Sequence, residues 1–463
     1  MRFRLNVLSH IVLCTFLVFL VPQGIKAESL PPDDFEVLDS SVDGTGSDCV
    51  SIQVDMTATN TMPVPSGCKD QLCKLILYTN SNMGAFGDGY SMEVYYYQWS
   101  SGNSWVGGPN VALGGVEFSD GFGDNGDGIG EGVFLGGTTS DGGYVRIMDD
   151  GDLENDPNLW TIESRATADL TSASLHVCPI SGCTYQVVSD NAVINTPSFC
   201  IDGLCMILRI NYNDFGAFGP GFGNPVFYEQ DSASDEWIGG PDISMGGIYF
   251  GAGWGENGTG GMTPIFDGGT TGGGEYASLL DDGAEWSASQ WSVEFNSGTD
   301  MDWVQYGFCP MACTEHHLIT HANIDTPAYC VDSLCTIVRW TDAGFGAWGP
   351  GLSWPVNYRQ KSNDNSWIGG PALCIGGQCF SDGSGINGDT GENLVYEGGY
   401  TSPNNGYVIL QDDDSTYETG PYQWNVEFIP EDGLSAASYY FCSNNCQETT
   451  FLINKQYLPL NNK

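Results

Sequence analysis

The stretch CKDQLC at residues 68–73 recurs as CIDGLC at residues 200–205 and as CVDSLC at residues 330–335. The copies start 132 and 130 residues apart. This interval is far longer than the roughly 20 to 50 residues of a solenoid or propeller repeat, so each copy should have a core of its own. Two cysteines on either side of an acidic turn can close a disulfide around a short hairpin. The stretch therefore predicts three similar domains in tandem, each stapled at the same place.

The sequence around each copy follows one common order. The cysteines are followed by GAFGDG, GAFGPG or GAWGPG, and then by a turn of the form W-[VI]-G-G-P at Trp105, Trp237 and Trp367. Short β-prone runs such as KLILY and YVRIM alternate with Gly, Asn and Asp turns, without a long amphipathic helical pattern. The order predicts an all-β protein of three tandem antiparallel β-sandwich or jelly-roll-like repeat domains.

The chain begins with the features of a secretory signal peptide. Arg2 and Arg4 precede an apolar run at 11–21, and the small residue Ala27 follows it. The run is too short for a membrane span, so we expect a secreted, extracellular-matrix protein without membrane insertion. The expected organisation is a signal peptide at 1–27, an acidic disordered leader at 28–48, repeat domains at 49–178, 183–309 and 313–442, and a C-terminal tail at 443–463.

The charge balance is strongly acidic. The chain has 13 basic and 58 acidic residues, and loss of Arg2, Arg4 and Lys26 with the signal peptide leaves ten basic residues and a net charge of −48. Charged residues make up only 15% of the chain and aromatic residues 12%, which is typical of a folded protein and not of an acidic tail. Such a chain repels nucleic acid and anionic membranes and collects cations.

Cysteine usage fits a secreted chain rich in disulfides. Of the 16 cysteines, Cys14 falls in the signal peptide. The expected hairpin disulfides are Cys68–Cys73, Cys200–Cys205, Cys330–Cys335 and, in the third copy alone, Cys374–Cys379.

The remaining cysteines allow two pairing schemes. In the first scheme, the last cysteine of each copy bonds the next one along the chain, as Cys178–Cys183, Cys309–Cys313 and Cys442–Cys446, and Cys49 is left over. In the second scheme, the first and last cysteines of each copy pair, as Cys49–Cys178, Cys183–Cys309 and Cys313–Cys442, and Cys446 is left over. Either scheme leaves one cysteine as a free thiol or for a disulfide to another chain.

A glycine-rich acidic loop, FSDGFGDNGDGIGEG at residues 118–132, is the candidate metal site. Calcium is bound by several oxygen atoms that converge from a flexible loop. The second copy has Ala252 and Thr259 at two of the acidic positions, so calcium binding, with a Kd on the order of 10⁻⁴ to 10⁻³ M, is expected in the first and third copies. The candidate ligands are Asp120, Asp124, Asp127, Asp382, Asn387 and Asp389.

The competing interpretation of this loop is a hairpin end in which Asp and Asn favour turns. The loop is not an EF-hand, because Phe122 stands at a ligand position and Asn125 replaces the required glycine. Each copy also contains a double aspartate, interpreted either as a solvated strand end or as a ligand pair: Asp149–Asp150, Asp281–Asp282 and Asp412–Asp413. A sequon at Asn257 predicts an exposed, glycosylated loop in the second copy.

Catalytic patterns are weak, and we expect no enzymatic activity. No Ser-His-Asp or Cys-His pattern repeats. His317 and His321 lie on one face of an expected strand and permit a zinc site. A glutamate follows the last tryptophan of each copy at Glu163, Glu294 and Glu427, but a glycosidase needs a second carboxylate in a defined place.

With its signal peptide and its Asp- and Gly-rich acidic loops on folded repeats, the chain resembles the acidic organic-matrix proteins of animal skeletons and shells. The resemblance implies a secreted protein that binds calcium or mineral surfaces in biomineralisation, with a calcium mineral or a matrix polysaccharide as partner. The alternative is a secreted lectin-like or adhesive protein in which Trp105, Trp237 and Trp367 stack on sugars.

Overall fold

The computed structural model describes residues 49–149, 158–258, 261–281, 289–299, 301–389, 391–412 and 422–444, together with the backbone of 449–452. The predicted signal peptide and leader, Cys446 and the second aspartate of each Asp pair lie outside these residues. In the described part of the chain no helix has both the length and the apolar character needed to cross a membrane.

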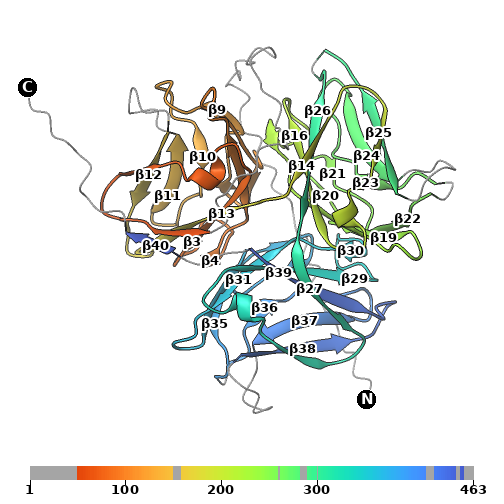
Figure 1. The fold of residues 1–463 in the computed structure, drawn as a ribbon. Coiled ribbons are helices and arrows are strands. Elements are labelled where there is room, and N and C mark those ends of the chain that lie inside the picture. The colour runs from red at the N-terminus through yellow and green to blue at the C-terminus, as the bar shows by residue number, and fades with distance from the viewer. Residues whose placement is uncertain are drawn as a thin grey trace, which may run out of the picture. The chain divides into compact units, whose positions relative to one another are not determined.

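The all-β prediction is confirmed, and each of the three repeats contains a large sheet and a four-stranded sheet (Figure 1). The large sheet of the first repeat has the order β40 (Thr449–Leu452), β1 (Val50–Gln53), β13 (Ala173–Pro179), β3 (Cys73–Thr79), β5 (Val94–Gln98), β6 (Ser104–Gly108) and β9 (Phe122–Asp124), with β4 (Gly89–Tyr90) beside β3. The four-stranded sheet has the order β10 (Gly132–Phe134), β11 (Tyr144–Asp149), β12 (Leu159–Arg165) and β2 (Asn60–Pro63).

The second repeat has the same topology. Its large sheet has the order β14 (Thr184–Val188), β26 (Val304–Pro310), β16 (Cys205–Asn211), β18 (Val226–Gln230), β19 (Glu236–Gly240) and β22 (Trp254–Glu256), with β17 (Gly221–Phe222) beside β16. Its four-stranded sheet has the order β15 (Ala192–Asn195), β25 (Gln290–Asn296), β24 (Tyr276–Asp281) and β23 (Pro264–Phe266).

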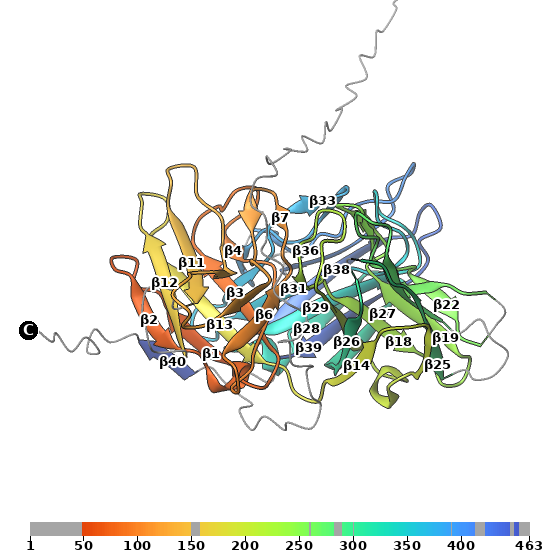
Figure 2. The same cartoon turned by 90° about the horizontal axis from the view of Figure 1, so that it is seen from above.

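The third repeat has the same strands in the same order as the second repeat. Its large sheet has the order β27 (Ala312–Leu318), β39 (Ala437–Ser443), β29 (Cys335–Thr341), β31 (Val356–Gln360), β32 (Ser366–Gly370) and β35 (Ser384–Ile386), with β30 (Gly351–Leu352) beside β29. Its four-stranded sheet has the order β28 (Ala322–Asp325), β38 (Gln423–Ile429), β37 (Tyr407–Asp412) and β36 (Leu394–Tyr396). All strand pairs are antiparallel except β40, which pairs in parallel with β1 and lies at that edge in Figure 2.

The two sheets of each repeat pack face to face as a sandwich. In the first repeat the ring of Tyr96 on β5 meets the ring of Trp160 on β12 edge to face, with centroids 5.0 Å apart. The other two repeats make the same contact at the same distance, between Tyr228 and Trp291 and between Tyr358 and Trp424. Because aromatic side chains bury large apolar areas, this contact anchors each core.

The large sheets are also covered on their outer faces. β11 alternates half-buried and buried residues, as expected for a strand with one solvated face, whereas every residue of β16 is buried. A strand buried on both faces needs a second packing partner, and here the partners are the other repeats. The three repeats accordingly belong to one compact unit.

Equivalent backbone contacts join the repeats in a cycle. The amide of Gly219 donates to the carbonyl of Asn110 at 2.7 Å, and the amide of Gly349 donates to the carbonyl of Asp242 at 2.8 Å. The amide of Gly87 closes the cycle by donating to the carbonyl of Ala372 at 2.6 Å. Each repeat therefore touches both of the others.

The repeated glycines make this close approach feasible. A Cβ atom on Gly108, Gly240 or Gly370 would lie 2.3, 2.0 or 2.1 Å from a carbonyl oxygen of the next repeat. The φ angles of these glycines are 151°, 148° and 153°, in the region that L residues rarely adopt. The Gly-Gly-Pro turns are thus contact points between repeats.

The disulfides follow the second pairing scheme. Cys49–Cys178, Cys183–Cys309 and Cys313–Cys442 each join the first strand of a repeat to its last strand. The first scheme is wrong, because these strands are antiparallel neighbours and, in the third repeat, Cys313 faces Cys442 directly. The hairpin pairs Cys68–Cys73, Cys200–Cys205, Cys330–Cys335 and Cys374–Cys379 are confirmed.

Candidate functional site

A buried tryptophan–aspartate pair anchors the acidic loop in every repeat. The indole nitrogen of Trp105 donates to the carboxylate of Asp149 at 3.0 Å, and Asp149 also accepts the amide of Glu131 at 2.7 Å. The second and third repeats repeat the indole bond in Trp237–Asp281 at 3.1 Å and in Trp367–Asp412 at 3.0 Å. The amides of Thr263 and Asn393 donate to Asp281 and Asp412 in the same way, so the end of each loop is tied to the core of its own repeat.

These pairs decide two open interpretations. Asp149, Asp281 and Asp412 are at most 1% exposed, so the solvated strand end is wrong for the first member of each double aspartate. The paired tryptophans are likewise at most 1% exposed. A sugar ring cannot stack on a buried indole, so sugar binding at these three positions is also wrong.

The beginning of each acidic loop belongs to the contact between repeats. A Cβ atom on Gly121, Gly253 or Gly383 would lie 1.9, 1.5 or 2.0 Å from a backbone oxygen of the next repeat. The glycine at this position is therefore needed for the contact between repeats, whether or not the loop binds a cation.

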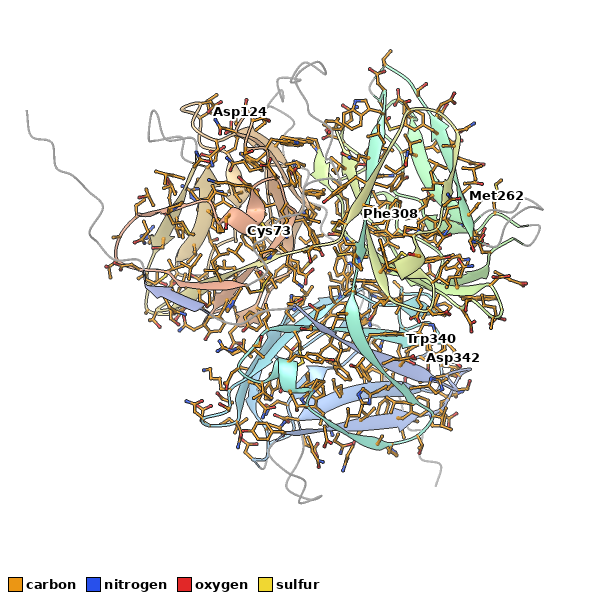
Figure 3. The ribbon with its side chains drawn as sticks, in the orientation of Figure 1. Cys73, Asp124, Met262, Phe308, Trp340 and Asp342 are labelled. Atoms are coloured by element: carbon orange, nitrogen blue, oxygen red, sulfur yellow. A yellow bond between two sulfur atoms is a disulfide. The ribbon has the colours of Figure 1, made fainter. Side chains whose placement is uncertain are left out.

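The aspartates proposed as calcium ligands make local backbone bonds. Asp120 accepts the amide of Gly132 at 2.6 Å, and Asp382 accepts the amide of Leu394 at 2.8 Å. Asp127 and Asp389 each cap a tight turn by accepting the amide two residues ahead, at 2.7 and 2.6 Å. Asp124 lies at the end of β9 at the periphery of the first repeat (Figure 3). No cluster of three or more His, Cys, Asp or Glu side chains suited to a metal ion occurs among the residues described.

The asparagine of the loop is an internal residue. Asn387 is 1% exposed, and its role as a calcium ligand stays a prediction. Asn257 is 2% exposed, and its amide nitrogen donates to Oε1 of Gln230 at 3.2 Å. The expected exposure of the sequon is therefore wrong, because the nitrogen that would carry a glycan is buried. The signal for burial was available in the sequence, since this asparagine recurs in all three loops although the acidic residues do not.

A pair of carboxyl groups in the first repeat was missed by sequence reasoning. Burial, together with the neighbouring Asp149, raises the pKa of Glu131 to about 9. Burial is also the main cause that raises the pKa of Asp149 to about 6. Thr263 and Asn393 stand at the position of Glu131 in the other repeats, and Asn393 donates to Asp412 at 3.0 Å. The first repeat thus has two adjacent carboxyl groups where the others have one carboxyl group and a neutral partner.

The buried aspartates make stability depend on pH. Burial raises the pKa of Asp412 to about 6, so between pH 4 and 6 the folded state holds a proton that the unfolded chain has released. Stability should then fall as pH rises, and the thermal unfolding midpoint should be higher at pH 5 than at pH 7. The Asp412→Asn variant, which cannot titrate here, should show a smaller change between these pH values. Equal pH dependence in both proteins would contradict the role of this carboxyl group.

Three basic residues of the described chain, Lys74, Arg209 and Arg339, are buried and neutralise no surface charge. Arg209 donates to the carbonyls of Ala277 and Gly268 at 2.8 and 2.7 Å, and Arg339 makes equivalent bonds in the third repeat. Lys74 is buried and pairs with Glu93 at 2.8 Å. The buried acidic residues of the described chain are Glu93, Asp149, Glu275, Asp281 and Asp412. The other described carboxylates therefore reach the surface.

The histidines and glutamates that were considered for a zinc site or a glycosidase site each bind a different neighbouring residue. Nδ1 of His317 lies 3.2 Å from the hydroxyl of Ser438, and Nδ1 of His321 accepts the amide of Phe428 at 3.1 Å. Glu163 forms an ion pair with Arg146, and Glu427 accepts the hydroxyl of Tyr407 at 3.1 Å. Both histidines thus have contacts of their own.

Comparison with known proteins leaves the chain without an assigned family. No family model matches the sequence, and a search of the curated proteins returns no match. The candidate site is therefore defined by its geometry alone, as exposed carboxylates on three acidic loops that a Trp–Asp pair and the inter-repeat glycines hold in place.

Proposed function

We propose that this protein is a secreted, non-enzymatic matrix protein whose exposed carboxylates bind calcium ions or the surface of a calcium mineral. The observation that carries the proposal is the excess of carboxylates at the surface, because Lys74, Arg209 and Arg339 are buried while all but five of the described carboxylates are exposed or partly exposed. A large unneutralised negative surface concentrates cations in the adjacent solvent. The proposed role is in biomineralisation, with the many carboxylates acting together.

Adsorption to calcium carbonate tests this function. The folded protein should adsorb at about 0.1 M salt and be released near 1 M, because the Debye length falls from about 10 Å to about 3 Å. Replacing Asp127 and Asp389 with asparagine should weaken adsorption more than replacing Glu117 and Glu236 with glutamine, which removes equal charge from exposed positions outside these loops. Adsorption that is unaffected by salt would contradict the proposal.

Carbohydrate binding is the second candidate function, and one exposed side chain favours it. Trp254 on β22 is 65% exposed, unlike the repeated tryptophans, and a ring of this kind can stack on a sugar. Retention on a polysaccharide column at 1 M salt that is lost in Trp254→Ala would favour the lectin over the matrix protein.

A further inference from the structure

A cavity of about 240 Å³ lies where the large sheets of the three repeats meet. Lys74, Met206 and Thr336 hold the same position in the three repeats, directly after the second hairpin cysteine, and all three line the cavity. Nζ of Lys74 donates to the hydroxyl of Thr336 at 2.9 Å, and the hydroxyl of Tyr95 lies 3.3 Å from the sulfur of Met206. The cavity thus lies at the common junction of the repeats.

A buried ion pair contributes to the polar part of the wall, together with Ser181, Thr336, Ser443 and Asn444. Nζ of Lys74 lies 2.8 Å from Oε1 of Glu93, and Oε2 of Glu93 accepts the hydroxyl of Tyr95 at 2.5 Å. Removing two charges from water is costly. At the positions of Lys74 and Glu93 the second repeat has Met206 and Pro225, and the third repeat has Thr336 and Pro355. The sandwich fold itself therefore does not require this pair.

The remaining wall is largely apolar. Met206, Phe227, Pro310 and Met311 contribute to it. A cavity of about 150 Å³ is enough to hold benzene, so this one has room for an aromatic ring that carries a substituent. Pockets at the interfaces between domains are common sites for small molecules, and a few polar groups set the orientation of the ligand.

The chemistry of the pair selects the class of ligand. An ammonium group has three N–H donors, of which the bonds to Glu93 and Thr336 use two. A carboxylate has about four lone-pair sites, so Glu93 can accept from a further donor. A hydroxyl group can therefore accept from Lys74 and donate to Glu93, whereas a charged ligand would add an uncompensated charge to a neutral pair. We propose that this junction cavity binds a small uncharged molecule with an apolar body and one hydroxyl group.

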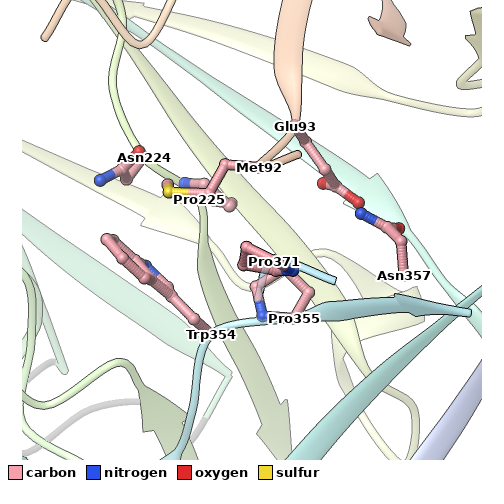
Figure 4. Close-up of a pocket in the computed structure, with 8 residues that line it drawn as sticks. All are labelled: Met92, Glu93, Asn224, Pro225, Trp354, Pro355, Asn357 and Pro371. Carbon is pink, nitrogen blue, oxygen red and sulfur yellow. The ribbon is translucent and has the colours of Figure 1, made fainter. Parts of the chain in front are cut away.

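The cavity is accessible from the surface. Ser181, in the segment that joins the first two repeats, and Ala312, the first residue of β27, line it and are exposed. On the other side, Glu93 also lines a separate cavity of about 20 Å³ beside Asn224 and Trp354 (Figure 4). Both polar atoms of the Asn224 side chain and the indole nitrogen of Trp354 lack a hydrogen-bond partner among the described residues. This smaller space holds about one or two water molecules and excludes the proposed ligand.

Calorimetric titration of the full mature chain with benzyl alcohol tests the proposal, with toluene as the probe that lacks the hydroxyl. We expect saturable binding of benzyl alcohol and at least about tenfold weaker binding of toluene, since one hydrogen bond to a charged group accounts for such a factor. The variant Ala312→Trp changes an exposed residue at the mouth and should weaken binding of both probes at least tenfold.

Two further variants separate the polar contact from the shape of the cavity. Lys74→Met combined with Glu93→Leu removes both polar side chains of the pair and should abolish the preference for benzyl alcohol over toluene. Lys361→Met removes a lysine that does not line the cavity and should leave both affinities unchanged. The proposal is overturned if benzyl alcohol does not bind saturably, if Ala312→Trp binds it as well as the parent protein, or if toluene binds equally tightly.

Discussion

Removal of the Cys49–Cys178 disulfide is expected to lower the free energy of unfolding by about 5 kcal/mol, since the cost of cross-linking an unfolded chain grows with the length of the closed loop. The two cysteines are 129 residues apart in sequence, and their disulfide joins the first strand of the first repeat to its last strand. Without this disulfide, the unfolded chain between the two cysteines is no longer closed into a loop. Its conformational entropy rises, and the folded state becomes less stable by comparison.

The hairpin disulfide Cys68–Cys73 provides a matched control in the same repeat. Its cysteines are five residues apart, and both are buried, as are Cys49 and Cys178. Replacing both cysteines of the hairpin with alanine should cost about 2 kcal/mol in the same chain-entropy account. Chemical denaturation of the two double-alanine variants measures the difference. Equal losses would show that loop length does not govern the contribution of these disulfides.

The second large effect is expected at the contact between the second and third repeats. Replacing Gly240 with alanine should destabilise the protein by about 4 kcal/mol, because a strained φ and a backbone overlap each cost about 1 to 3 kcal/mol. The added Cβ atom would lie 2.0 Å from the carbonyl oxygen of Leu352, and rotation of a side chain cannot relieve a contact with backbone.

Gly272 in the same repeat is the control for this substitution. It is exposed, and a Cβ atom there would meet nothing within 4 Å. Gly272→Ala should change stability by no more than about 0.5 kcal/mol. Hydrogen exchange of the Gly349 amide, which donates to Asp242 across the same contact, should accelerate in Gly240→Ala alone. Equal stability of the two alanine variants would contradict a tight contact at Gly240.

Much of the local architecture was predictable from the sequence because it depends on residues close together in the chain. The hairpin disulfides illustrate this, since a spacing of five residues around a turn leaves each cysteine one near partner. The long disulfides were not predictable, because Cys178 is near Cys183 in sequence but faces Cys49 in the sheet. Only the pairing of the first strand with the last one distinguishes these partners.

The candidate site was less predictable because residue type alone does not report burial. Asp149 and Asp127 have the same chemistry in the sequence, yet Asp149 is buried against Trp105 while Asp127 caps an exposed turn. Asn257 satisfies the glycosylation pattern, yet it is buried and donates to Gln230 on β18, 27 residues earlier in the chain. Environments of this kind depend on contacts between residues far apart in the chain.

The sequence by itself determined that this chain has three copies of one all-β unit, with their hairpin staples and a strongly acidic balance, because spacing, turn residues and charge are properties of residue order. The tertiary structure alone decided that the repeated glycines join the repeats and that the long disulfides close each one. It also decided that Lys74 and Glu93 meet beside a cavity. These features arise where backbones from different repeats approach within a few ångströms, and residue order does not specify which repeat will lie against which surface.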